Sequence, residues 1–306
     1  MTALTKALAD YLRVQHALGF KQKQAGEMLP AFVRYLEERG LKYVTTTAGL
    51  AWATLPRDRD PNWWRKRLTV VRGFAKYLHT IDPRNEVPPT EYLPLRRNRR
   101  RPYVYEATDI SALLAATSTL KRPLRAATYK TMLGLLAVTG MRVGEAIALD
   151  DSDFDRRRAV LVIRKPKFDK SREVPLHAST CSALVDYRAL RDRLAPCQQT
   201  PSLFVSTAGT RLIYQNVHET FLRIVYGAGL EHRRPRPTLH DLRHTFAIRT
   251  VIDWHRARLD VEARLPLLST YLGHIGPEST YWYLTAVPEL LEAATARLER
   301  FSRATP

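Results

Sequence analysis

Two histidines four residues apart, His240 and His244, are spaced to share one face of a helix and hold a metal ion. The string that contains them, HDLRH, has aspartate where the HExxH signature of zinc proteases has its glutamate base. No third ligand is evident, and Arg243 would put a cation beside the metal. Zinc is therefore a weak alternative, and we predict a site without metal. The GxGxxG, GxxxxGK(S/T) and GxSxG strings of nucleotide-binding proteins and serine hydrolases are absent from the sequence.

Four short segments carry side chains that are suited to catalysis on a phosphodiester. His240 and Arg243, three residues apart, would lie on one face of a helix near its N-terminus, where the helix dipole favours a phosphate. Thr238 and Asp241 have the spacing of a capping box that starts this helix. The four segments are TGMRVGE at 139–145, Lys167 in the string KPKFDKS, TLHDLRHT at 238–245, and YLGH at 271–274 with Tyr283 nine residues after its histidine.

In this order and at this spacing the segments resemble the tyrosine recombinase (phage integrase) family. The resemblance covers about residues 105–300. It extends more loosely to the N-terminal part, which looks like the core-binding domain of that family. By position, the resemblance implies a set of catalytic residues with Tyr283 as the nucleophile and Glu145 as a supporting acid, namely Arg142, Lys167, His240, Arg243, His274 and Tyr283.

The chemistry of these side chains agrees with those roles. Attack on a phosphodiester spreads negative charge over the non-bridging oxygens, which two guanidiniums can bind in pairs of hydrogen bonds. A tyrosine hydroxyl, with a pKa near 10, needs a base and nearby cations to become a nucleophile. The leaving 5′ oxygen needs a proton, which a lysine can deliver. The arginines would stabilise the negative charge on the phosphoryl oxygens, so we predict no cofactor.

Some positions have competitors. Lys165 and Lys170 share the turn with Lys167, which the following string SREVPL favours. Tyr271 and Tyr281 compete with Tyr283, which the spacing favours. His244 fits a packing role near the site better than a catalytic one. For Glu145, the alternative to a supporting role in catalysis is a local one, as a helix cap or in an ion pair.

The resemblance implies a site-specific DNA recombinase that cuts and rejoins strands through a 3′-phosphotyrosyl intermediate. A type IB topoisomerase that relaxes DNA is the alternative within enzymes, and a DNA-binding protein without catalysis is the alternative outside them. The partners expected are double-stranded DNA and three further copies in a synaptic homotetramer. Residues 287–301 are expected to form a helix with an apolar stripe that docks on a neighbouring subunit, and packing of this helix on its own domain is a nearly equal alternative.

The elements that must position these residues are mostly helices. Apolar spacing downstream of residue 105 predicts helices at 108–116, 126–138, 179–194, 217–226, 239–254, 261–272 and 288–300. Residues 159–164 and 172–176 are expected to be antiparallel strands joined by the lysine turn, and 203–206 a third strand. The fold class expected is mainly α, with a mostly helical catalytic domain that contains a small antiparallel β-sheet.

Upstream, the spacing predicts amphipathic helices at 4–18, 24–38 and 62–78. We expect residues 1–93 to form a helical DNA-binding domain, 94–105 a basic linker, and 106–306 the catalytic domain with its C-terminal helix. The linker, LPLRRNRRRPYVY with its two prolines, has nothing that we expect to be buried. Its five arginines are expected to lie along DNA phosphates: Arg96, Arg97, Arg99, Arg100 and Arg101.

The composition agrees with a polyanionic partner. The chain has 306 residues, 49 Lys and Arg against 30 Asp and Glu, and a net charge of +19. Two cysteines, Cys181 and Cys197, make neither a metal site nor a disulfide framework. No apolar run is long enough to span a membrane, and the polar N-terminus does not resemble a signal peptide. We therefore expect a cytoplasmic protein.

Overall fold

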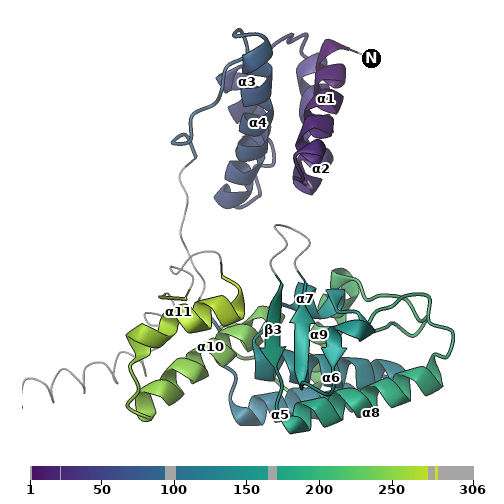
Figure 1. Ribbon diagram of the computed structural model, residues 1–306. Helices are drawn as coiled ribbons and strands as arrows, with labels where there is room; N and C mark the ends of the chain where they lie inside the picture. The colour runs from purple at the N-terminus through teal and green to yellow at the C-terminus, as the bar shows by residue number, and fades with distance from the viewer. Residues whose placement is uncertain (1, 21, 94–100, 165–170, 275–279, 282–306) are drawn as a thin grey trace, which may run out of the picture. The chain divides into compact units, whose positions relative to one another are not determined.

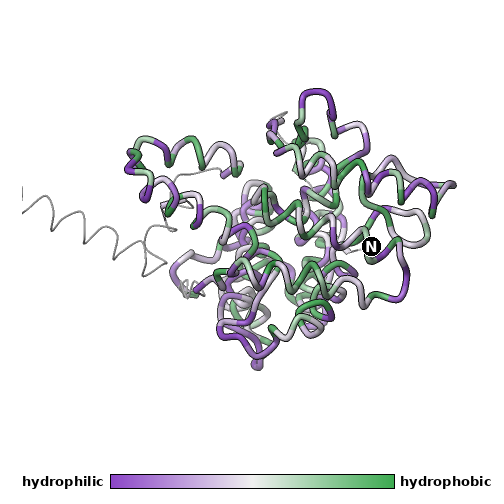
Figure 2. Tube along the Cα trace, turned by 90° about the horizontal axis from the view of Figure 1, so that it is seen from below, coloured by the Kyte–Doolittle hydropathy of each residue, from purple (hydrophilic) through white to green (hydrophobic). Residues whose placement is uncertain are grey.

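The computed structural model describes residues 2–20, 22–93, 101–164, 171–274 and 280–281. The chain forms two compact units, residues 1–99 and 100–306, which we describe one at a time. In the described part of the chain, no helix has both the length and the apolar content needed to cross a membrane. Short hydrophobic and hydrophilic stretches alternate along many of the helices, as Figure 2 shows.

The described part of the first unit is built from helices (Figure 1): α1 (Ala3–Ala17), α2 (Lys23–Glu37), α3 (Thr46–Thr54) and α4 (Pro61–Ile81). The spacing of apolar residues predicted α1, α2 and α4 to within a few residues. Thr2 caps α1 by accepting from the Thr5 amide at 3.2 Å, and Asp60 caps α4 by accepting from the Asn62 amide at 2.7 Å. A shared apolar core includes the fully buried Leu29, Phe32, Leu36, Val71 and Phe74.

The described part of the second unit is mainly helical with one small sheet, which confirms the predicted fold class. Its helices are α5 (Ala107–Ala116), α6 (Pro123–Thr139), α7 (Val143–Ala148), α8 (Ala178–Leu194), α9 (Tyr214–Gly227), α10 (Leu239–Arg256) and α11 (Val261–Leu272). The predicted helix at 288–300 lies outside the described residues. Short 3-10 turns at Thr117–Thr119 and Asp151–Asp153 complete the helical elements of the described part.

The sheet has three antiparallel strands in the order β1 (Phe154–Asp155), β2 (Val160–Ile163) and β3 (Arg172–Pro175). Leu161 of β2 pairs with Val174 of β3, and both side chains are buried in the core. The predicted third strand at 203–206 is wrong. Ser202 and Val205 make only isolated bridges, to Asp150 and Arg211, because this stretch crosses the core as an irregular segment with Leu203 and Phe204 fully buried.

Helix α6 lies at the centre of the second unit, where it packs against α5, α8 and α10. The helix is followed by its C-cap, Gly140, whose φ of +61° is left-handed backbone. A Cβ at this position would lie 2.5 Å from the ring of Phe246 on α10, so only glycine allows the two chain segments to approach so closely. Helices α10 and α11 share a smaller apolar cluster that contains Ile248, Leu265 and Leu272.

The C-terminal part of the predicted linker belongs to the second unit. The expectation that nothing in this stretch is buried is wrong, because Tyr103 and Tyr105 lie in the core and stack edge to face at 4.9 Å. The Tyr105 hydroxyl donates to the Thr238 carbonyl at 3.0 Å, and the Tyr105 amide donates to Thr245 Oγ1 at 2.9 Å. These bonds fix the start of α10. Arg101 is exposed, and Arg96, Arg97, Arg99 and Arg100 lie outside the described residues.

Candidate active site

The predicted site residues that the structure describes, apart from the linker arginine Arg101, lie at the ends of helices that meet at one place in the second unit. Arg142 stands between α6 and α7, and Glu145 lies in the first turn of α7. His240 and Arg243 lie in the first turns of α10, and His274 follows the end of α11. The Thr238 amide donates to Asp241 Oδ2 at 2.8 Å, which confirms the predicted capping box at the start of α10.

Arg243 joins three helices. Its side chain is only 2% exposed. Nη1 donates to the carbonyl of Gly140, after α6, at 2.9 Å, and Nη2 donates to the carbonyl of Leu272, at the end of α11, at 2.7 Å. Carbonyls at helix C-termini have no partner within the helix and carry partial negative charge, so they suit a buried guanidinium. The fold therefore places a fixed cation where α6, α10 and α11 meet.

Arg142 is held beside Arg243, because it binds the residue that directly follows Leu272. Its Nη2 donates to the carbonyl of Gly273 at 3.2 Å, and Gly273 adjoins the Leu272 that binds Arg243. Its Nη1 donates to Glu145 Oε1 at 3.1 Å. The two predicted arginines are thus anchored on neighbouring peptide groups of one segment.

Glu145 binds a third arginine that the sequence analysis did not identify. Arg172, the first residue of β3, donates from Nη1 to Oε1 at 3.0 Å and from Nη2 to Oε2 at 2.6 Å. The Arg142 amide also donates to Oε2 at 2.9 Å. Burial by itself would raise the pKa of Glu145, but the hydrogen bonds from Arg172 and Arg142 and their positive charges outweigh it and lower this pKa to about 2. Glu145 is therefore a carboxylate at neutral pH.

The histidines of the site are neutral at neutral pH. The rings of His240 and His244 meet edge to face with centroids 4.5 Å apart. Loss of solvent, then the charge of Arg243, lowers the pKa of His240. Loss of solvent also lowers the pKa of His244 to about 3 and, with the charges of Arg243 and Arg142, that of His274 to about 4. A neutral imidazole has one N–H donor and one acceptor nitrogen, so it can bind a phosphate oxygen or accept a proton.

His274 has a side-chain partner that the sequence analysis missed. Its Nδ1 lies 2.8 Å from Oγ1 of Thr280, whose side chain is almost fully buried. A hydroxyl at this nitrogen fixes the orientation of the ring and directs Nε2 away from Thr280. A search for small polar residues between His274 and Tyr283 would have drawn attention to Thr280.

Two of the predicted residues, Lys167 and Tyr283, lie outside the described residues, as do Lys165 and Lys170. Of the competing tyrosines, Tyr271 is stacked on Phe246 with centroids 5.6 Å apart, and its burial raises the pKa of its hydroxyl. A raised pKa disfavours a nucleophile. Tyr281 is exposed.

The described residues offer no group of three His, Cys, Asp or Glu side chains arranged to hold a metal ion. His240 and His244 therefore lack a described third ligand. The two anchored guanidiniums of Arg142 and Arg243 favour an anion at this place. What the arrangement can do chemically is hold a phosphate between two fixed guanidiniums and neutral imidazoles.

Comparison with known proteins places the chain in a family. Residues 104–289 match the model of the phage integrase family. The chain is 43% identical to a putative integrase/recombinase, y4rB, of Sinorhizobium fredii, over 98% of each chain. It is 29% identical to the tyrosine recombinase XerD of Caulobacter vibrioides, over 77% of this chain and 74% of XerD.

Solved structures share the fold. XerH site-specific recombinase, bound to palindromic difH substrate in a post-cleavage complex, matches with a TM-score of 0.65 and 21% identity, over 88% of this chain and 77% of XerH. A lambda integrase tetramer bound to a Holliday junction matches with a TM-score of 0.62 and 19% identity, over 92% of this chain and 76% of the integrase. The matched family model, the close relative and the anchored arginine pair lead to one conclusion: the chain belongs to the phage integrase family, the tyrosine recombinases that cut and rejoin DNA at specific sites.

Proposed function

We propose that Tyr283 attacks a DNA phosphodiester and that the anchored arginine pair, Arg142 and Arg243, binds the phosphate while it reacts. The observation that carries the proposal is that both guanidiniums are fixed by the carbonyls of Gly273 and Leu272, next to His274. Donors that are fixed before the reaction need no reorganisation when charge develops on the phosphoryl oxygens.

The reaction balances without a cofactor. The Tyr283 oxygen forms a bond to phosphorus, and the bond to the 5′ oxygen breaks, which leaves a 3′-phosphotyrosyl link. A neutral imidazole of His240 or His274 can accept the tyrosine proton, and Lys167 donates a proton to the leaving 5′ oxygen. The new phosphodiester with tyrosine conserves the energy of the broken bond, so a 5′ hydroxyl from another strand can reverse the step.

The partner of this reaction is double-stranded DNA, which the net charge of +19 favours. We assign DNA binding also to the helical unit at residues 1–93 and to the linker arginines. The assembly is a homotetramer in which residues 287–301 of each copy dock on a neighbour. The lambda integrase structure, which is a tetramer on a Holliday junction, supports this assembly for a chain of the same family. A tetramer can hold two DNA sites together, so we propose strand exchange between two sites rather than relaxation of DNA.

The experiment that tests the proposal uses the full chain and a nicked duplex whose cleaved end diffuses away. The expected product is a protein covalently joined to the 3′ end of one strand, with a free 5′ hydroxyl on the released strand. A covalent link to the 5′ end, or cleavage without any covalent protein, would contradict it. Joining of strands from two different duplexes separates recombination from relaxation of a single supercoiled circle.

A further inference from the structure

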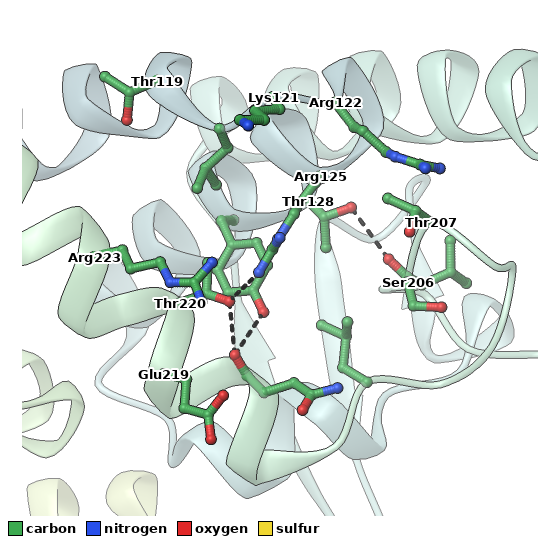
Figure 3. A pocket seen from close by; sticks show the side chains of 15 residues that line it. Thr119, Lys121, Arg122, Arg125, Thr128, Ser206, Thr207, Glu219, Thr220 and Arg223 are labelled. Atoms are coloured by element: carbon green, nitrogen blue, oxygen red, sulfur yellow. Dashed lines mark hydrogen bonds between the residues drawn. The ribbon is translucent and has the colours of Figure 1, made fainter.

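A second basic site lies in the second unit, at the opposite end of α6 from Arg142. A cavity of about 740 Å³ is bounded by the N-terminal end of α6, one side of α9 and residues 205–212. Figure 3 shows its side chains, with the ends of Arg125 and Arg223 lying close to Thr220. The cations that line it come from both helices and the residues before α6: Lys121, Arg122, Arg125 and Arg223.

These four cations have no ion-pair partner among the described residues. The cavity has one carboxylate, Glu219, which accepts from Gln215 Nε2 at 2.8 Å instead. Other arginines of the same unit are paired: Arg211 with Asp150, and Arg191 with Asp151. Like charges gathered around a concave surface repel one another and focus a positive potential into it. An anion bound there would relieve that repulsion.

Arg125 is held in place for such an anion. Its Nη2 donates to Thr220 Oγ1 at 2.7 Å, and the Thr220 hydroxyl donates to the Asn216 carbonyl at 2.7 Å. The side chain is half-buried, and its guanidinium carbon lies 6.0 Å from the centroid of the Tyr129 ring. A guanidinium fixed in this way keeps further N–H donors for a phosphate, and the hydroxyls of Thr128, Ser206 and Thr207 line the same cavity.

The cavity is separate from the active site. Helix α6 has 17 residues, so its two ends are about 25 Å apart at ~1.5 Å per residue. Arg142 follows the C-terminal end, and Lys121 and Arg122 precede the N-terminal end. For a duplex that runs along α6 and rises ~3.4 Å per base pair, about 25 Å corresponds to roughly seven base pairs.

We propose that this cavity binds a backbone phosphate of the same DNA duplex, roughly seven base pairs from the phosphate that is cut. This inference rests on the proposed function, because that function supplies the bound DNA duplex. A free nucleotide or inorganic phosphate carries the same chemical group, so the experiment must separate these two sources.

The test compares two double variants of the full chain, each of which removes one lysine and one arginine. Lys121→Gln/Arg223→Gln changes the cavity, and Lys130→Gln/Arg193→Gln changes exposed positions of α6 and α8 outside it. All four side chains are exposed, so both variants should fold, and thermal melting checks this. The measurement is the slope of log binding constant against log salt concentration, on a long duplex and on one that ends about five base pairs from the cleavage point.

On the long duplex, the steepness of the slope should fall by up to about 0.9 in the cavity variant, which is the contribution of the one phosphate contact that the cavity makes. The control variant should change little, and the short duplex should remove the difference between them. An equal slope for wild type and cavity variant on the long duplex would overturn the proposal. If inorganic phosphate raises the melting temperature of wild type but not of the cavity variant, while the DNA slopes agree, the cavity binds a free phosphate instead.

Covalent attachment of wild type to the nicked duplex, measured in the same samples, reports on the proposed function separately. Attachment without a slope difference contradicts only the second site. A slope difference without attachment contradicts only the proposed chemistry of Tyr283.

Discussion

Both oxygens of the Glu145 carboxylate accept hydrogen bonds from Arg172, at 3.0 Å from Nη1 and 2.6 Å from Nη2. This side-by-side pair is the strongest geometry between an arginine and a carboxylate. Both side chains are nearly buried, with 12% and 13% exposed. Because Glu145 also binds Arg142, the pair connects the first residue of β3 to the arginine that we assign to the phosphate.

Replacing Glu145 by glutamine should cost stability that depends on pH. The pKa of Glu145 is lowered to about 2 in the folded chain, so its contribution is fully present above the unfolded pKa near 4.5 and is lost as pH falls toward 2. The shift corresponds to roughly 3 kcal/mol at neutral pH. Urea unfolding at several pH values should show the difference between wild type and Glu145→Gln shrinking below about pH 4.5. A difference that is the same at every pH would contradict this account.

Removing Arg172 should slow cleavage more than it weakens DNA binding. Arg172→Gln leaves Glu145 with one arginine and frees Arg142 to move, so we expect the rate of covalent attachment on saturating DNA to fall about tenfold or more. Arg158→Gln is the matched control, because Arg158 makes a similar pair with Glu173 on the same sheet, at 2.9 and 2.8 Å, but is 59% exposed. Arg172→Lys should restore part of the rate. Equal rates for both glutamine variants would remove Arg172 as a positioning residue.

The hydroxyl of Thr280 should matter through His274. Thr280→Val keeps the shape of this buried side chain and removes the partner of Nδ1, so we expect a loss of about fivefold in the cleavage rate. Thr280→Ser keeps the hydroxyl and should remain close to wild type. The pH dependence of the rate should also change in the valine variant, because its His274 ring is less constrained. If the serine and valine variants behave alike, the methyl group and not the hydroxyl is what matters.

Much of the site could be predicted because its residues lie in short strings whose order and spacing are distinctive. Arg142, His240, Arg243 and His274 are within such strings, and the structure brings them to one place. Arg172 was missed because its partner, Glu145, lies 27 residues away and no local pattern links them. Tyr103 and Tyr105 were misjudged for a similar reason: Thr238 and Thr245, which hold Tyr105, are more than 130 residues away.

The fold was predictable where one face of an element is buried and the other exposed. Helix α3 was missed because its buried residues, Gly49 and Trp52 among them, do not stand out against a sequence of small apolar side chains. Residues 203–206 were predicted as a strand because apolar residues follow one another there, but a continuous apolar run does not separate a strand from an irregular buried segment.

Lys167 should act as the general acid for the leaving 5′ oxygen. Lys167→Ala should slow cleavage of normal DNA by about 10²- to 10⁴-fold, because an alkoxide is a very basic leaving group. Replacing the bridging 5′ oxygen by sulfur gives a leaving thiolate that needs no proton, so the variant should cleave this substrate almost normally. Arg142→Ala and Arg243→Ala should stay slow on both substrates. Rescue by sulfur in Lys165→Ala or Lys170→Ala, and not in Lys167→Ala, would move the acid to that residue.

The identity of the nucleophile is tested most directly by covalent trapping on the nicked duplex with two matched variants, Tyr283→Phe and Tyr281→Phe. Each substitution removes one oxygen atom, so DNA binding should stay close to wild type in both. We expect Tyr283→Phe to form no covalent protein–DNA product and Tyr281→Phe, changed at an exposed side chain, to form it at nearly the wild-type rate. Loss of the product in Tyr281→Phe with its retention in Tyr283→Phe would contradict the account.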